Sequence, residues 1–520
     1  MASDDDARSV VEAEPSGRLR KVVLRNIAWN SAGVCVDLFA GFLVAPFLVR
    51  RLGVTSYGLW IVLGSLSGYF GLLDFGLRGS LGRELAFQRA NNAWEKINRT
   101  FNSALAIYSL IGAVALAVAV VVTIALPWLF DLPVELIGTA RLAMLLVGIN
   151  MALSFPGQVF DGSLWAAQRF DLLNRIDISA SVIRVALTFL LIDGPQDLVT
   201  LAGITLATWG GAGGAKAVVT FRLDRFLETH WRHVEWGAIR DLFSYGWRQF
   251  VLTTARLTKT QLSPVLIASF LGVAMVTPLS IARRLQDYAS KLLWTATGVL
   301  TPVATGFHAG GQERHQQYLF IEGGKYCAVI SLFLAAYFIF LGRAIIGLWM
   351  GSEFAYASLF LVIIVLGELL PMTQSLTGSI ILATARHGPL ARLAVIESLI
   401  SIVAIALVAR PFGLVGVCIA LAIPQAMFSG IATLYYGCKV ADVSVTRYLA
   451  DAMSPAIMAM SVPVALLWLV AVNRMPTRWS ELIVVTIGYG IVFMASSWFV
   501  LKPVFAQRAL LDLRAVLFRT

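Results

Sequence analysis

Charged residues are scarce in this sequence. Only 14% of its 520 residues are Asp, Glu, Lys or Arg, whereas a soluble domain carries about 25%. Hydrophobic residues make up 58% of the chain, and the mean hydropathy is +0.78. A water-soluble core of this length could not bury so much apolar surface, so the composition predicts an all-α polytopic membrane protein.

Cysteine and histidine are also few. Four cysteines lie in or beside apolar runs without paired spacing, which argues against a disulfide framework or a zinc site: Cys35, Cys327, Cys418 and Cys438. Among five histidines, His230 and His233 share the motif "HWRH". Two histidines without further ligands nearby predict solvated side chains, so neither a metal nor a cofactor is expected.

The sequence has neither a recognisable signal peptide nor a hydrophilic stretch long enough to form a separate domain. Residues 1–24 are polar and predict a disordered cytoplasmic tail. The longest hydrophilic loop, around residues 221–240, is predicted to be cytoplasmic.

A membrane-spanning helix needs about 20 mostly apolar residues. By this measure the sequence predicts about fourteen spans, at 26–49, 57–82, 101–128, 136–165, 172–192, 197–220, 241–270, 276–307, 320–349, 355–384, 388–409, 413–437, 448–472 and 480–501. Pro, Gly or charge interrupts the fourth, eighth and tenth spans. These interruptions predict bent helices beside a cavity.

Lys and Arg are distributed unequally between the predicted loops. With the N-terminus inside, about 25 of the 41 cations fall in cytoplasmic segments and about seven in outer loops. This bias predicts that both termini are cytoplasmic. It also explains much of the formal net charge of +11 without a nucleic-acid partner.

A weak internal repeat links the two halves of the chain. "APFLVRRLGV" ends the first predicted span and "SPVLIASFLGV" ends the seventh, which aligns Gly53 with Gly272. The offset predicts two pseudo-symmetric six-helix lobes around a central cationic cavity, plus two C-terminal helices. The predicted boundaries are 1–24 for the tail, 25–235 and 236–440 for the lobes, and 441–520 for the last two helices and the cytoplasmic C-terminus.

Charges inside predicted spans are costly in lipid, at about 2.5–3.5 kcal/mol each. In "YFGLLDFGLRGSLGREL", Asp74 and Arg78 are four residues apart, which predicts an intrahelical pair facing the interior. The glycines around them predict close approach of a neighbouring helix. Lys216 and Arg184 are predicted to extend toward the membrane surface.

The seventh and eighth spans are rich in cations. We predict a cationic substrate-binding lumen formed by Arg78, Arg248, Arg256, Lys259, Arg283, Arg284 and Lys291. Because guanidinium groups suit phosphate, the substrate is expected to bear phosphate. Interior carboxylates are candidates for ion coupling or for pairing with these cations: Asp37, Asp74, Asp161, Asp177, Asp287, Glu368 and Glu397.

The N-terminal region resembles a known family. "APFLVRRLGVTSYGLWIVLGSLSGYFGLLDFGLRGSLGRELA", residues 45–86, resembles the signature of Wzx-type polysaccharide flippases of the multidrug/oligosaccharidyl-lipid/polysaccharide exporter superfamily. The resemblance implies two lobes that rock around a central cavity in the bacterial inner membrane. It also implies an undecaprenyl-pyrophosphate-linked oligosaccharide as substrate, for O-antigen, exopolysaccharide or capsule synthesis. Polysaccharide polymerase or ligase partners are expected from the resemblance alone.

Four alternatives stay open or are disfavoured. A lipid II flippase would use the same cationic cavity, whereas a multidrug or cation antiporter is disfavoured by the sign of that charge. A polyprenol-dependent glycosyltransferase or polymerase is disfavoured because the outer loops are short. ATP hydrolysis is unsupported, since "WGGAGGAKAV" fails the P-loop pattern; its Gly210 and Gly214 are predicted to be helix-packing positions. No enzymatic activity is therefore expected.

Overall fold

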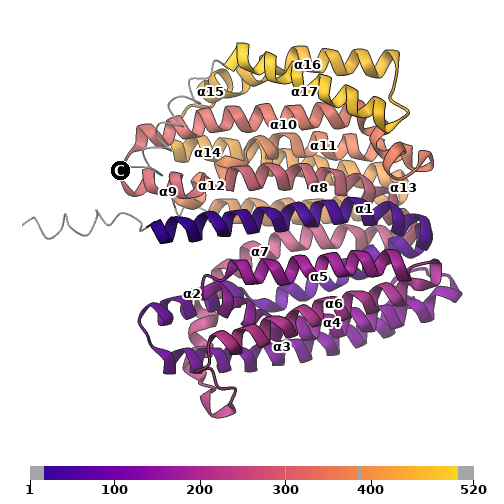
Figure 1. Ribbon diagram of the computed structural model, residues 1–520. Coiled ribbons are helices and arrows are strands. Elements are labelled where there is room, and N and C mark those ends of the chain that lie inside the picture. Colours follow the sequence, from indigo (N-terminus) through magenta and orange to yellow (C-terminus); the bar gives the residue numbers. More distant parts are fainter. Residues whose placement is uncertain (1–16, 299, 385–387, 502–520) are drawn as a thin grey trace, which may run out of the picture. The chain divides into compact units, whose positions relative to one another are not determined.

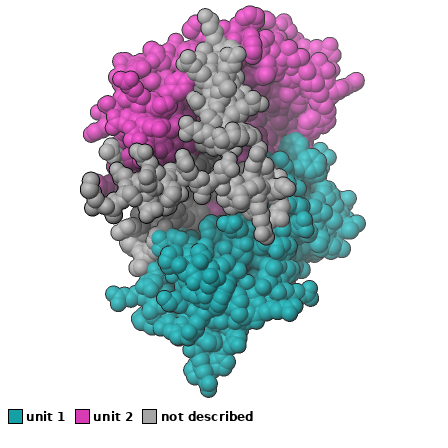
Figure 2. All heavy atoms as spheres, turned by 60° about the vertical axis from the view of Figure 1, so that its left-hand side comes forward, with its two compact units in different colours: residues 1–253 teal, residues 254–520 magenta. Residues whose placement is uncertain are grey.

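The computed structural model describes residues 17–298, 300–384 and 388–501. Within these ranges, the side chains of residues 17–28, 30, 31, 244–260, 296, 298, 301, 302, 382 and 383 lie outside the described part. Within these ranges the regular structure consists of helices, and no strand forms (Figure 1). It divides into two compact units, residues 1–253 (unit 1) and 254–520 (unit 2), which Figure 2 colours separately. The border falls inside one helix, and the predicted division at residues 235 and 440 stays a prediction.

Unit 1 is a bundle of long apolar helices. Its elements are α1 (Gly17–Phe70), η1 (Gly71–Asp74), α2 (Leu77–Ala90), α3 (Trp94–Leu129), α4 (Val134–Ala166), α5 (Phe170–Leu191), η2 (Pro195–Asp197), α6 (Leu198–Leu223), η3 (Trp231–His233) and the start of α7 (Trp236–Leu271). Helix α4 packs against both α3 and α6, and α5 packs against α1 and α6. Small residues permit the α3–α4 contact: a Cβ at Gly112 would lie 2.5 Å from the carbonyl oxygen of Ala152.

Unit 2 contains the remaining helices. They are the end of α7, then η4 (Val273–Met275), α8 (Val276–Gly298), α9 (Thr301–Ala309), α10 (Glu313–Trp349), η5 (Ser352–Ala357), α11 (Ser358–Thr373), α12 (Ser375–Ala383), α13 (Gly388–Pro424), the π-helix η6 (Gln425–Ala432), α14 (Thr433–Ala441), α15 (Val445–Tyr448), the π-helix η7 (Leu449–Met453), α16 (Ser454–Asn473) and α17 (Trp479–Leu501). Helix α10 packs against α11 and α16, and α16 packs against α17. Helices α16 and α17 therefore attach to the rest of unit 2 through α10.

Nine segments of the described ranges are long and apolar enough to cross a membrane. They are Ala32–Asp74, Trp94–Leu129, Val134–Ala166, Pro195–Leu223, Glu313–Trp349, Ser352–Thr373, Gly388–Ala441, Val445–Asn473 and Trp479–Leu501. Gly388–Ala441, 54 residues long, contains two of the predicted spans, and Ala32–Asp74, 43 residues long, covers parts of two. The predicted spans at 172–192, 241–270 and 276–307 lie on α5, α7 and α8–α9, outside the nine. The count of fourteen and the cytoplasmic termini thus stay predictions.

The predicted interruptions occur in two of the three expected spans. The eighth divides into α8 and α9, and the tenth divides at Gln374 between α11 and α12. The fourth does not divide, because α4 runs through Pro156 from Val134 to Ala166. A proline removes one backbone donor, and the long helix on either side of Pro156 tolerates that loss.

The two glycines that the repeat aligned share an unusual backbone conformation. Gly53 has φ 79° and ψ 168°, and Gly272 has φ 90° and ψ 155°. Side chains other than glycine rarely adopt such positive φ values, because the Cβ then meets the neighbouring carbonyl. At Gly53 the chain kinks inside α1, and at Gly272 it leaves α7 for η4. The positive φ therefore explains why glycine occupies both positions.

Candidate functional site

The helix that the sequence predicts across Asp74 and Arg78 is broken between them. The 3₁₀ turn η1 ends at Asp74, Phe75 and Gly76 have φ of 49° and 74°, and α2 begins at Leu77. The prediction that Asp74 and Arg78 form an intrahelical pair on one continuous helix is therefore wrong. Glycine at position 76 permits the left-handed turn, and the break lets the two charged side chains contact different helices.

Asp74 and Arg78 each contact a neighbouring helix. The Tyr108 hydroxyl on α3 donates a hydrogen bond of 2.7 Å to Asp74 Oδ1. Arg78 Nη2 lies 3.9 Å from Asp161 Oδ2 on α4, while the guanidinium remains within electrostatic range of Asp74. The break in the second predicted span is thus tied by polar contacts to α3 and α4.

Lys216 on α6 lies between two carboxylates. Its Nζ is 2.8 Å from Asp161 Oδ1 on α4 and 2.8 Å from Asp177 Oδ1 on α5. The lysine is only 7% exposed, so the prediction that it extends toward the membrane surface is wrong. A buried lysine ammonium needs opposite charge nearby, and two aspartates supply it here.

These charged groups border a cavity of about 610 Å³ within unit 1. Its lining comprises Gly71, Leu72, Asp74, Gly76, Arg78, Gly79, Gly82, Asp161, Gly162, Trp165, Phe170, Leu173, Asn174 and Asp177. The sequence did not indicate that these groups meet, because the polar lining residues come from four separate elements, η1, α2, α4 and α5. Their charges in spanning helices were the available signal.

Glycines give the cavity part of its wall. At Gly82 a Cβ would lie 3.1 Å from the ring of Trp165, and at Gly162 a Cβ would lie 3.1 Å from Leu81. The predicted close approach of a neighbouring helix is therefore confirmed at Gly82, where α2 meets α4. A Cβ at Gly79 would instead meet open space. The same holds at Gly210 and Gly214, so their prediction as packing positions is wrong.

Two further predicted residues of unit 1 form a chain of polar contacts beside the cavity lining. The Ser181 hydroxyl donates to Asp37 Oδ1 at 3.3 Å, and Arg184 Nη2 donates to the same hydroxyl at 3.5 Å. The Arg184 guanidinium also lies 5.4 Å from the ring centre of Trp209. Asp37 thus contacts α5 and is not among the residues that line the cavity.

Unit 2 brings some of the other predicted residues together. Arg283, Gln286, Asp287, Glu368 and Gln425 border a small cleft. The carboxylate of Asp287 is within electrostatic range of both Arg283 and Arg284 on the same helix. Lys291, one turn further, is exposed.

The remaining carboxylate of unit 2 and three predicted cations lie elsewhere. Glu397 is 3% exposed, accepts a hydrogen bond from the Ser429 hydroxyl and is not among the residues that border the small cleft. Arg248, Arg256 and Lys259 belong to α7, but their side chains lie outside the described residues. Their place in a cationic lumen stays a prediction.

Comparison with known proteins identifies the family. The sequence profile of a family described as polysaccharide biosynthesis proteins matches residues 23–308, more than half of the chain. Two shorter alignments join it to individual relatives. A Shigella flexneri protein named as an O-antigen transporter is 32% identical over 97 residues, 18% of this chain and 23% of that protein. A Yersinia pseudotuberculosis protein named as an O-antigen export protein is 37% identical over 71 residues, 14% of this chain and 16% of that protein. Each alignment thus spans less than a quarter of the relative's length.

Solved structures show which fold the chain shares. The lipid II flippase MurJ in an inward closed conformation has a TM-score of 0.69 at 15% identity, covering 92% of this chain and 98% of its own. An inward-facing multidrug resistance transporter of the MATE family has a TM-score of 0.59 at 14% identity, covering 78% and 98%. At these identities the similarity concerns the fold. The chain therefore belongs to the polysaccharide biosynthesis protein family, as a multi-pass membrane protein whose fold is that of the MurJ and MATE transporters and whose N-terminal signature is of the Wzx type.

Proposed function

We propose that this chain moves undecaprenyl-pyrophosphate-linked oligosaccharides from the cytoplasmic to the outer leaflet of the bacterial inner membrane, by alternating access. Its family supports a role in polysaccharide synthesis, and the names of its relatives support transport of O-antigen units. The observation that carries the proposal is the unit 1 cavity, because it offers sugar-type contacts inside a bundle of membrane helices.

The cavity suits a sugar better than a pyrophosphate. Three aspartates line the cavity, whereas only two cations, Arg78 and Lys216, lie beside them. The formal charge of the cavity therefore does not favour an anion. Sugar hydroxyls are both donors and acceptors, and carboxylates with a guanidinium offer both partners. The ring of Trp165, which is 47% exposed, adds an apolar surface for the C–H face of a sugar. We therefore assign Asp74, Asp177 and Arg78 to the sugar head group.

The pyrophosphate is assigned to cations outside this cavity. Those proposed to attract it are Arg248, Arg256, Lys259, Arg283, Arg284 and Lys291. Among them, Arg283 and Arg284 lie on α8, within electrostatic range of Asp287, and guanidinium groups suit phosphate. Asp37, Asp287, Glu368 and Glu397 are proposed as coupling or pairing groups. The polyprenyl tail would remain in lipid, and polymerase or ligase partners would act after transport.

Two alternative substrates are suggested by the names of transporters with the same fold. Lipid II carries the same lipid pyrophosphate, so the same cations would serve it. An organic cation is favoured by one observation, the three aspartates at the unit 1 cavity. Lys216 opposes that alternative, because its ammonium already lies against two of the three carboxylates.

Deletion of the gene in its host tests the proposal. We expect loss of surface polysaccharide together with accumulation of single lipid-linked repeat units on the inner leaflet. Normal polysaccharide with altered sensitivity to cationic drugs would instead establish the antiporter, and arrested cell-wall synthesis would establish the lipid II flippase.

Complementation of that deletion tests the cavity. Gly79 lines the cavity and a Cβ there meets no atom within 4 Å. We therefore expect Gly79→Leu to fill part of the cavity, so transport should fall while the protein level stays normal. Gly211→Leu is the matched control, because Gly211 is exposed, meets no neighbouring atom and does not line the cavity. Equal transport by both variants would remove the cavity from the substrate path.

A further inference from the structure

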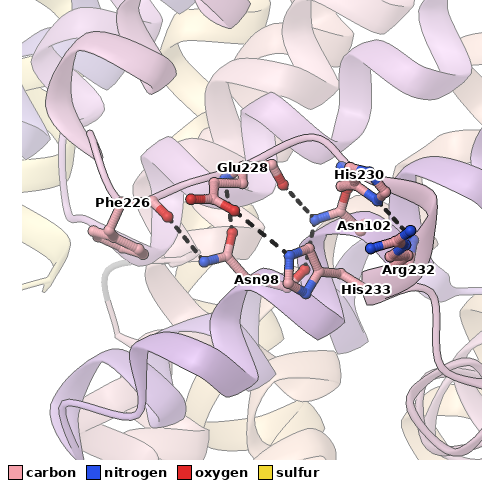
Figure 3. Close-up of polar contacts among 7 residues, drawn as sticks. All are labelled: Asn98, Asn102, Phe226, Glu228, His230, Arg232 and His233. Atoms are coloured by element: carbon pink, nitrogen blue, oxygen red, sulfur yellow. Dashed lines mark hydrogen bonds and ion pairs between the residues drawn. The ribbon is translucent and has the colours of Figure 1, made fainter.

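The loop between α6 and α7, residues 224–235, is held against the side of α3 by side-chain amides (Figure 3). Asn98 Nδ2 donates to the Phe226 carbonyl at 2.9 Å, and the Glu228 backbone N–H donates to Asn98 Oδ1 at 2.9 Å. One turn later, Asn102 Nδ2 donates to the Glu228 carbonyl at 2.7 Å, and the His230 N–H donates to Asn102 Oδ1 at 2.9 Å. Each asparagine therefore pairs with the loop backbone as a neighbouring strand would.

Further contacts hold both ends of this loop. The Glu235 backbone N–H donates to the Ser103 hydroxyl at 2.8 Å, and the ring of Phe226 lies 4.8 Å from that of Trp94. Asn102 and Ser103 are 4% and 0% exposed. Because its backbone is fixed against a long helix, the loop presents a defined set of side chains rather than a changing one.

The loop and the adjoining ends of α6 and α7 expose aromatic and basic side chains. Trp231 and Trp236 are each 77% exposed. Four arginines around them are exposed and have no carboxylate within ion-pair distance among the described residues: Arg222, Arg225, Arg232 and Arg240. We call these six residues the Trp–Arg surface.

The acidic residues of the loop lie near basic groups other than the four arginines. Asp224 pairs with Arg89 on α2, and Glu235 lies 3.5 Å from Arg99 on α3. Glu228 lies 3.7 Å from His233 within the loop itself. Within the described part of the chain, the four arginines of the Trp–Arg surface thus keep their positive charge without a carboxylate partner.

The position of the loop along α3 places this surface at the edge of the membrane. Helix α3 starts with the polar stretch "WEKINRTFNS", residues 94–103, and its apolar run begins at Ala104. The loop contacts residues 98, 102 and 103, so at 1.5 Å per residue it lies within about 9 Å of the apolar run. The headgroup region on each side of a bilayer is about 5–8 Å thick, so the loop lies at or just beyond it.

We propose that the Trp–Arg surface binds anionic phospholipid headgroups of the adjoining leaflet. Tryptophan favours this depth because its ring is apolar and its N–H is polar. Each exposed arginine near an anionic membrane surface raises binding by about fivefold. The positive charge of the arginines suits lipid phosphates, and the predicted depth of both tryptophans is that of the headgroups. A soluble protein would instead have to reach a surface that lies flat along a membrane helix.

A fluorescent label in the loop tests the proposal with the full chain in lipid nanodiscs. The label is placed at Thr229→Cys in a Cys35→Ser background, since Thr229 is exposed and the other three cysteines are buried. We compare phosphatidylcholine discs with discs that also contain phosphatidylglycerol. With the anionic lipid, a headgroup-depth nitroxide lipid should quench the label and aqueous iodide should not.

Substitutions then separate the two parts of the surface. Arg232→Gln should lower the preference for the anionic lipid by about fivefold, and Trp231→Ser with Trp236→Ser should expose the label to iodide. Trp128→Ser is the control, because Trp128 is 80% exposed but lies at the far end of α3. Iodide quenching that ignores lipid composition would overturn the proposal. Protection from iodide without quenching by the nitroxide lipid would overturn it as well, by indicating a protein partner.

Discussion

The lysine between two aspartates in unit 1 gives the sharpest prediction. Lys216→Met removes the ammonium and keeps a side chain of similar length, so Asp161 and Asp177 face each other without a counter-ion from α6. Removing one partner of a buried ion pair costs about 3–5 kcal/mol. The two carboxylates are partly exposed, at 21% and 38%, so we expect about 3 kcal/mol, the lower end of that range.

Thermal unfolding in detergent, followed by intrinsic tryptophan fluorescence, measures this effect. For a unit of this size each kcal/mol shifts the melting temperature by about 2 °C, so Lys216→Met should melt about 6 °C lower. Arg51→Met is the matched control, because Arg51 forms an exposed ion pair with Asp193 at 3.4 Å. Such a pair contributes about 0–1 kcal/mol. Equal melting temperatures for the two variants would refute the assignment of Lys216 as a buried counter-ion. Lys216→Met combined with Asp161→Asn should recover part of the loss, since one unpaired charge is then removed.

Three further predictions concern single contacts. Tyr108→Phe removes the hydrogen bond to Asp74 and should lower the free energy of unfolding by about 1.5–3 kcal/mol, as measured by chemical denaturation in detergent. Gly53→Ala forces a Cβ into a positive φ and should cost about 1–2 kcal/mol, whereas Gly64→Ala in the same helix should be neutral or stabilising; the order of their melting temperatures checks this. Asn102→Ala removes both hydrogen bonds to the α6–α7 loop and should speed amide hydrogen exchange there, while unchanged exchange would contradict the clamp.

The sequence predicted which residues contribute to the site but not which of them contact each other. The sequence indicated that Asp74, Arg78 and Asp161 would face the interior, because charge is costly in lipid. It also paired Asp74 with Arg78 from their spacing alone, on the assumption of a continuous helix. The left-handed residues at 75 and 76 invalidate that assumption, and no local propensity distinguishes this break from the many other glycines of the chain.

Apolar runs by themselves determined that this chain is a membrane protein built of helices, since backbone groups in lipid must be satisfied within the helix. The motif around residues 45–86 determined its family resemblance, and the "LGV" match identified two glycines with the same positive-φ conformation. Only the tertiary structure decided which charges meet. Lys216 lies 39 residues from Asp177 and 55 from Asp161, and packing of α4, α5 and α6 brings them together. Spacing along one helix carries no information about such contacts, because they depend on which faces of three helices turn toward each other.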